Sequence, residues 1–410
     1  MSEKIRRRQL EACMQARDHV ARSLLCGQPA DAALAEWLRG RPSAGARDRR
    51  LIRSAIFAEI RWHGWVRCID DPPARLAIAL ALDGLPELAQ QINPDLAPMP
   101  PPSADLSDLS HWLTALMPGR AFPPEDLVPS WIWEEIPEDG RPHFRIRFLE
   151  SLQRRPPLWL RARFGRLREA LEALRKAGVE ACEHPRVANA IRVDGACSRA
   201  ILAPLLHQYV EIQDFASQQI GLFCAPASGE RWWDMCAGGG GKALHLLDLT
   251  QDHAFVYCTD LRSEPLRDLA RRARAAGFRN WQARQADATS PISGFKDRFQ
   301  GILIDAPCSG TGTWSRNPDG RFRVKREDLP RYTRIQNSLL QAATEHLAQS
   351  GRIIYSVCSL TRTETEDVTE RFCRESGFHV LRTLRIDPAD GPGIGMWAAE
   401  LRRRSSGRAS

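Results

Sequence analysis

Long apolar runs are missing from this 410-residue sequence. The longest extends over Leu76–Leu82 and is bounded by Arg75 and Asp83, whereas a membrane-spanning helix needs about 20 apolar residues. The N-terminal residues also lack the apolar segment of a secretory signal, because Arg6–Arg8 are soon followed by Glu11. We therefore expect a cytoplasmic protein that has no membrane partner.

Closely spaced pairs of cysteines are also absent from the sequence. The eleven cysteines are scattered along the chain, with no C-x-x-C pair and no compact group of cysteine and histidine, so neither a zinc site nor a disulfide framework is indicated. We expect no metal, and we expect most of these cysteines to be small buried hydrophobic residues. Cys308 and Cys358 differ from the others because of the motifs around them.

The sequence has no excess of acidic residues, because 58 lysines and arginines outnumber 50 aspartates and glutamates. The excess is concentrated in two stretches: residues 1–61 contain 13 basic and 7 acidic residues, and residues 141–176 contain 11 and 3. Such clustering favours a polyanion, such as a nucleic acid, as the partner. The alternative is a solvated, arginine-rich surface, and charge alone does not exclude it.

The first half of the sequence predicts two small units. Helical spacing recurs through residues 1 to about 85, as in Ile52, Ile56 and Ile60, and predicts an all-helical bundle. Prolines crowd residues 93–110 and predict a linker or surface loop. After it, we expect a helix over Leu106–Met117, a strand over Pro157–Arg163, a helix over Leu167–Ala177 and a strand over Ala190–Val193.

Strands and helices alternate from about Arg231 onward. The expected strands are Trp232–Met235, Phe255–Thr259, Asn280–Arg284, Gly301–Asp305 and Arg352–Val357, and the expected helices include Ser263–Ala276 and Glu327–Gln349. This alternation predicts an α/β domain with a parallel sheet covered on both faces. In such a sheet the ligand lies at the carboxyl ends of the strands.

The first of these strands leads into a glycine loop, Cys236-Ala237-Gly238-Gly239-Gly240-Gly241-Lys242. It is not a phosphate-binding Walker A loop, because Cys236 stands where that motif needs its first glycine. Asp260 and Asp287 follow the next two strands, where acidic residues contact a ribose in nucleotide-binding folds. Together these features suit S-adenosylmethionine better than NAD, although a tight turn and helix caps would give the same pattern.

Two further strand ends carry cysteines. The strand Gly301–Asp305 is followed by Asp305-Ala306-Pro307-Cys308-Ser309-Gly310-Thr311-Gly312, and the strand Arg352–Val357 by Cys358. A buried cysteine is far commoner than a reactive one, but two at adjacent strand ends beside a cofactor loop indicate a site. A thiolate that adds to C6 of a pyrimidine makes C5 nucleophilic, and an acid and a second thiol can assist the addition and the later elimination.

At these residues the sequence resembles the RsmB/Sun-type (NOP/Sun family) RNA (cytosine-5) methyltransferases. The middle motif is intact, including the following Arg316-Asn317-Pro318-Asp319. The glycine loop departs from the family's Asp-x-Cys-Ala-Ala-Pro-Gly-Gly-Lys, with Gly238 and Gly239 in place of Ala-Pro, and Val357 replaces Thr before the last cysteine. Neither change removes a thiol or a charged group.

The resemblance implies a role for each motif residue. Cys358 would attack C6, Cys308 would assist breakdown of the adduct, and Asp305 would contact the target cytosine and line the cofactor site. S-adenosylmethionine would be held by Cys236, Ala237, Gly238, Gly239, Gly240, Gly241, Lys242, Asp260, Asp287 and Asp305.

The resemblance also implies a domain order. Residues 1–135 would form a NusB-like all-α RNA-binding domain with its linker, 141–205 a small α+β RNA-binding module, 206–403 a Rossmann-like methyltransferase domain and 404–410 a basic tail. The arginine-rich strand Arg154–Arg163 would contact phosphates, with domain packing as the alternative. We expect a monomer that methylates cytosine C5 in RNA, most simply ribosomal RNA. A tRNA methyltransferase and a non-catalytic RNA-binding ribosome assembly factor are the alternatives.

Overall fold

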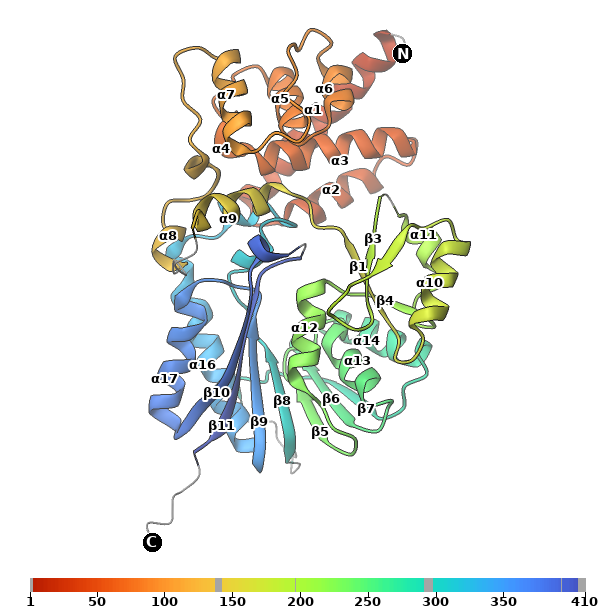
Figure 1. The fold of residues 1–410 in the computed structure, drawn as a ribbon, viewed down its shortest axis with the longest axis vertical. Helices are drawn as coiled ribbons and strands as arrows, with labels where there is room; N and C mark the ends of the chain where they lie inside the picture. The colour runs from red at the N-terminus through yellow and green to blue at the C-terminus, as the bar shows by residue number, and fades with distance from the viewer. Residues whose placement is uncertain (1–2, 137–141, 196, 291–297, 392, 405–410) are drawn as a thin grey trace. The chain divides into compact units, whose positions relative to one another are not determined.

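The computed structural model describes residues 3–136, 142–195, 197–290, 298–391 and 393–404 (Figure 1). Contacts divide the chain into two units. The helical unit comprises Met1–Arg155 and Thr313–Arg326, and the α/β unit comprises Pro156–Gly312 and Glu327–Ser410. The chain therefore leaves the α/β unit after Gly312 and returns to it at Glu327.

The helical unit contains the predicted bundle. Its central helix, α5, covers the apolar run Leu76–Leu82, which is buried on all sides, as expected for a core helix. Asp71 caps α5, because its carboxylate accepts a hydrogen bond from the backbone N–H of Ala74 at 2.9 Å. The helices are α1 (Glu3–Leu25), α2 (Ala30–Arg39), α3 (Ala46–Arg61), α4 (His63–Val66), α5 (Pro72–Leu82), α6 (Pro86–Ile92), α7 (Leu106–Leu116), η1 (Pro124–Leu127), α8 (Ile132–Glu135), α9 (Phe144–Gln153) and α15 (Gly320–Arg323).

Arg321 of α15 ties the late segment into this bundle. Its side chain is 1% exposed, and its guanidinium donates to the backbone carbonyls of Arg61, Leu127 and Leu152 at 3.1, 3.3 and 2.7 Å. Burial lowers the pKa of Arg321 to about 9, so it stays charged at neutral pH. Three separate segments thus share one buried donor.

The α/β unit begins with a small sheet of four antiparallel strands in the order β2-β3-β1-β4. Its core includes Leu160 of β1, Leu174 of α10 and Ile191 of β3, so the helix α10 covers one face. The elements are β1 (Leu158–Ala162), α10 (Leu167–Lys176), β2 (Ala181–Glu183), β3 (Ala190–Val193), α11 (Arg199–Leu202) and β4 (Val210–Ile212).

The rest of the α/β unit is a large seven-stranded sheet in the order β10-β11-β9-β8-β5-β6-β7. The strands β9, β8, β5, β6 and β7 are parallel, as the sequence predicts. Its elements are α12 (Phe215–Cys224), β5 (Arg231–Asp234), α13 (Gly241–Leu249), β6 (Phe255–Asp260), α14 (Ser263–Ala275), β7 (Trp281–Gln285), β8 (Phe299–Asp305), η2 (Thr311–Thr313), η3 (Arg326–Asp328), α16 (Leu329–His346), β9 (Leu347–Val357), η4 (Arg362–Glu364), α17 (Glu366–Ser376), β10 (Phe378–Ile386), η5 (Pro388–Asp390) and β11 (Met396–Arg403).

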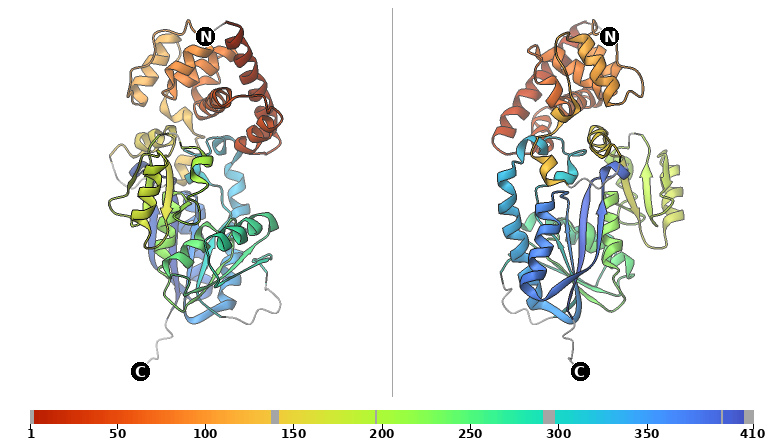
Figure 2. Two further views of the ribbon diagram at one scale, coloured as in Figure 1. Left: turned by 90° about the vertical axis from the view of Figure 1, so that its right-hand side faces the viewer. Right: turned by 60° about the vertical axis from the view of Figure 1, so that its left-hand side comes forward.

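Helices cover both faces of the large sheet, as Figure 2 shows. The consecutive residues Trp232 and Trp233 point to opposite faces, the first into a core with α12, α13 and α14 and the second into a core with α16 and α17. This arrangement confirms the predicted Rossmann-like fold, with the carboxyl ends of the parallel strands at one edge.

Several elements depart from the expectations. The helix predicted over Glu327–Gln349 ends at His346, because the strand β9 begins at Leu347. The helix α9 and the antiparallel strands β10 and β11 were not predicted. The last strand, β11, runs to Arg403, immediately before the basic tail predicted over 404–410. Residues 405–410 of that tail lie outside the described residues.

Candidate active site at the strand ends

The glycine loop, residues 236–242, connects β5 to α13 and requires glycine at two positions. Gly238 and Gly240 have φ angles of +50° and +81°, in the left-handed region that side chains disfavour. A Cβ on Gly240 would also lie 2.5 Å from Cγ of Leu269. The loop backbone is therefore packed against α14 with no room for a side chain at Gly240.

Asp260, at the end of β6, contacts this loop directly. Its Oδ2 accepts a hydrogen bond from the backbone N–H of Gly238 at 2.9 Å, and its Oδ1 accepts one from that of Arg262 at 2.9 Å. Burial raises its pKa, but the hydrogen bonds from Arg262 and Gly238 prevail and lower the pKa of Asp260 below its ordinary value. An ionised carboxylate thus lies beside the loop.

Asp287 is placed differently. It is exposed and follows β7, and its Oδ1 accepts hydrogen bonds from the backbone N–H and the hydroxyl of Thr289 at 2.9 and 2.6 Å. These bonds stabilise the local turn. The contribution of Asp287 to a cofactor site stays a prediction.

Lys242, the last residue of the glycine loop, and Asp305, the last residue of β8, form an ion pair. Nζ of Lys242 lies 2.6 Å from Oδ2 of Asp305, and the hydroxyl of Ser356 donates to Oδ1 at 3.0 Å. Burial alone would lower the pKa of Lys242, but the charge of Asp305 raises it above its ordinary value. A buried, charged amine therefore fixes one oxygen of Asp305.

Asp234 lies beside this pair, and the sequence analysis did not select it. It ends β5, is 1% exposed, and its Oδ1 accepts no hydrogen bond from the described residues. Burial, followed by the nearby charge of Asp305, raises its pKa to about 7. Its place at a strand end, two residues before Cys236, was the available signal, but the sequence does not reveal its burial.

Cys308 and Cys358 meet, as their positions on adjacent parallel strands predict. Their Sγ atoms are 3.3 Å apart. The contact with Cys358 and burial both raise the pKa of Cys308 well above its ordinary value, so Cys308 is a protonated thiol near neutral pH. Burial and then the charges of Asp234 and Asp305 likewise raise the pKa of Cys236.

A second missed residue, Glu364, joins the two cysteine loops. Its carboxylate is fully buried and accepts hydrogen bonds from the backbone N–H of Ser309, the amide of Gln336 and the hydroxyl of Thr361, at 2.9, 3.1 and 3.1 Å. The hydroxyl of Ser309 also donates to it. Glu364 therefore anchors the residue after Cys308 to the loop that follows Cys358.

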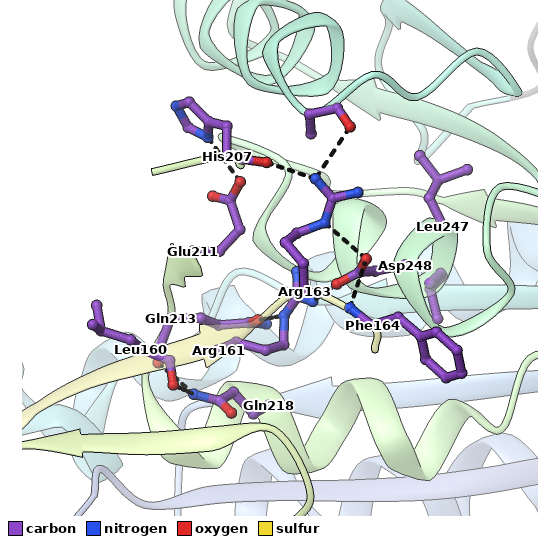
Figure 3. Close-up of polar contacts among 12 residues, drawn as sticks. Leu160, Arg161, Arg163, Phe164, His207, Glu211, Gln213, Gln218, Leu247 and Asp248 are labelled. Atoms are coloured by element: carbon purple, nitrogen blue, oxygen red, sulfur yellow. Dashed lines mark hydrogen bonds and ion pairs between the residues drawn. The ribbon is translucent and has the colours of Figure 1, made fainter. Parts of the chain in front are cut away.

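The arginine-rich strand does not present all its side chains to solvent (Figure 3). Arg161 is 2% exposed and pairs with Asp248 at the end of α13. Arg163 pairs with the same carboxylate at 2.8 Å and donates to the carbonyl of His207 at 2.6 Å. The phosphate-contact hypothesis is therefore wrong for Arg161 and Arg163, and the domain-packing alternative describes them.

Together these residues form a compact chemical site. The side chains of Cys308 and Cys358 lie at the same edge as a carboxylate held by an ammonium group and a glycine loop beside an ionised aspartate. This arrangement suits covalent catalysis by a thiol next to a bound small molecule. In the part of the chain that the structure describes, no cluster of three or more His, Cys, Asp or Glu side chains is arranged to hold a metal. No described helix is long and apolar enough to cross a membrane.

Comparison with known proteins finds a methyltransferase match within the second half of the chain. Residues 222–400 match the family model described as 16S rRNA methyltransferase RsmB/F. Ribosomal RNA small subunit methyltransferase B of Salmonella paratyphi B is 29% identical over 253 residues, 61% of this chain and 58% of that protein. The protein of the same description from Erwinia tasmaniensis is 27% identical over 286 residues, 67% and 66% of the two chains. The matches thus cover less than two thirds of either relative.

Solved structures share the fold. The crystal structure of PH0851 aligns over 96% of this chain and 98% of its own, with a TM-score of 0.74 and 19% identity. NSun6 from Pyrococcus horikoshii, crystallised with SFG, aligns over 63% of this chain and 93% of its own, with a TM-score of 0.56 and 16% identity. At these identities the likeness concerns the fold alone.

Proposed function

We propose that this chain, whose residues 222–400 match the 16S rRNA methyltransferase RsmB/F model, transfers a methyl group from S-adenosylmethionine to C5 of a cytosine in RNA. The contact of 3.3 Å between Cys308 and Cys358 carries the proposal, because this reaction needs a nucleophile at C6 and a proton donor for its later release. Ribosomal RNA is the proposed substrate, because the relatives are named for it.

The site residues fit S-adenosylmethionine. The glycine loop presents backbone to a ligand with no Cβ in the way, and the ionised Asp260 beside it suits hydrogen bonds from ribose hydroxyl groups. NSun6, which shares the fold, was crystallised with SFG, an analogue of this cofactor. Residues 236–242, Asp260 and Asp305 would hold the cofactor, which supplies an electrophilic methyl group when bound.

The protein's own groups would perform the remaining steps. Cys358, as a thiolate, adds to C6 of a base that has left its stack, and this addition makes C5 nucleophilic. Asp305, oriented by Lys242 and Ser356, accepts a hydrogen bond from the exocyclic amine of the cytosine. After methylation, the C5 proton passes to water, the electrons of the C5–H bond form the C5=C6 double bond, and Cys358 leaves C6 as a thiolate. The thiol of Cys308 can then donate a hydrogen bond to the departing sulfur.

Labelled methyl transfer to RNA from a strain that lacks this gene tests the proposal. Ribosomal and transfer RNA are separated after reaction, and modified cytosines are mapped. Label at C5 of a defined cytosine in ribosomal RNA is the expected result, and label in transfer RNA alone would favour the tRNA alternative. Cofactor binding without any label would favour a non-catalytic assembly factor that keeps the fold.

A further inference from the structure

Arg272 of α14 contacts the glycine loop and the small sheet at the same time. Its Nη1 donates to the backbone carbonyl of Gly239 at 2.6 Å, and its Nη2 pairs with Oε2 of Glu211 at 2.9 Å. Glu211 belongs to β4, and its carboxylate is 3% exposed. One guanidinium therefore links the loop to a strand that lies outside the large sheet.

The link continues into the small sheet. The second oxygen of Glu211 lies 2.7 Å from Nδ1 of His207 (Figure 3), and the backbone of Glu211 lies opposite that of Arg161 in the antiparallel register of β4 and β1. Both carboxylate oxygens are thus engaged, which fixes the side chain that holds Arg272. A guanidinium that donates to two such acceptors has a defined orientation.

The glycine loop needs such a restraint. Four consecutive glycines lose more conformational freedom on ordering than other residues do. Gly239 has no side chain that would restrict its φ angle. The loop is instead held from two sides, by Asp260 at the N–H of Gly238 and by Arg272 at the carbonyl of Gly239.

The small sheet also holds the helix that follows the loop. Arg161 and Arg163 pair with Asp248 near the end of α13, whose first residue, Gly241, belongs to the loop. The sheet therefore contacts both helices that flank the glycine loop. A change in how the sheet docks would act on the loop from α13 and from α14.

We propose that Arg272 is a positioning residue that holds the glycine loop in its cofactor-binding conformation, and that Glu211 makes this hold depend on the docked small sheet. The affinity for the cofactor then depends on whether the small sheet is docked against α13 and α14, although no residue of that sheet need touch the cofactor. The identity of the ligand rests on the proposed function, but the restraint on the loop does not.

The full-length variants Arg272→Met and Glu211→Gln test this coupling. Arg271→Met is the matched control, because Arg271 neighbours Arg272 on α14 but is exposed, and among the described residues its ion pair is with Asp268 of the same helix. Two readouts are compared: hydrogen exchange of residues 236–242 without ligand, and the Kd for S-adenosylmethionine by calorimetry. Thermal unfolding checks that each variant is folded, and Arg272→Lys replaces Arg272→Met if that variant is not.

We expect faster exchange in the loop and about a tenfold higher Kd for Arg272→Met, which is the loss of about one charge-assisted hydrogen bond. Glu211→Gln should act in the same direction, and the double variant should fall short of the sum of the two effects. Arg271→Met should leave both readouts unchanged.

Loop exchange in Arg272→Met that equals that of Arg271→Met would overturn the positioning role. An effect of Arg272→Met without any effect of Glu211→Gln would overturn the coupling to the small sheet. If the unmodified protein bound no S-adenosylmethionine, the proposed function would fail, and loop exchange would still decide the role of Arg272.

Discussion

The Sγ atoms of Cys308 and Cys358 lie 3.3 Å apart although 50 residues separate them in the sequence. The parallel register of β8 and β9 produces this contact, because Asp305 is opposite Ser356 and each cysteine follows within three residues. Glu364 then holds the two following loops together. The two thiols are therefore close enough for one to donate a hydrogen bond to the sulfur of the other.

Replacing Cys358 by alanine should abolish methyl transfer, with a rate at least about a thousandfold lower, because the nucleophile is lost. Cofactor binding should persist, since other strands form the glycine loop. The measurement is labelled methyl transfer beside calorimetric cofactor binding. Full turnover by Cys358→Ala would show that another group attacks the base.

Replacing Cys308 by alanine should trap a covalent complex with RNA, because Cys358 still adds to C6 while its release is impaired. The complex would appear as a band of retarded, labelled RNA on a denaturing gel. Cys358→Ala is the control and should give no such band. Trapping by Cys358→Ala instead would reverse the two assignments.

Gly240→Ala should lower the free energy of unfolding by about 1–3 kcal/mol, because the new Cβ meets Leu269 and the φ angle of +81° is strained. Gly241→Ala is the matched control for stability, since a Cβ there meets no atom within 4 Å. Denaturant unfolding of both variants checks this difference. Equal stability would mean that the loop adjusts at no cost.

Asp234→Asn should change how stability depends on pH. The folded state raises the pKa of Asp234 from 3.8 to about 7, so the folded protein binds the proton more tightly than the unfolded chain does. Stability of the unmodified protein is then lost as pH rises from about 4 to about 7. The melting temperature of the variant, relative to the unmodified protein, should therefore rise over this range and level off above it. A constant difference would contradict the shift.

Asp248→Ala should destabilise the α/β unit by about 3–5 kcal/mol, because Arg161 is buried and would lose its carboxylate partner. Glu375→Ala is the control, since the Glu375–Arg371 pair is exposed and should contribute at most about 1 kcal/mol. Denaturant unfolding measures both. Similar losses would show that burial does not strengthen the Asp248 contacts.

The sequence predicts well which residues lie at the ends of the strands, because the pattern that marks each of them is confined to a few neighbouring residues. Gly238, Asp260, Asp305, Cys308 and Cys358 follow hydrophobic runs that can be recognised one at a time. Proximity across the sheet then follows from the parallel order.

The burial of a charged side chain and the identity of its ion-pair partner depend on residues far away in the sequence, so the sequence does not reveal them. Nothing in the threonine-rich stretch after Cys358 distinguishes the buried Glu364 from Glu366, two residues later. In the same way, an arginine in a basic strand looks like a phosphate ligand until its partner is known. Asp248, which pairs with Arg161, lies 87 residues away.

The segment Thr313–Arg326 limits how the protein can be divided into fragments. Arg321 donates to backbone carbonyls of three segments in the first 155 residues, so a fragment that stops at Arg155 lacks its own buried donor. During synthesis the helical unit cannot be completed until the Thr313–Arg326 segment, which interrupts the α/β unit, has left the ribosome. Residues 1–155 are therefore not a complete unit. A chimera that exchanges them between relatives would also have to exchange the Thr313–Arg326 segment.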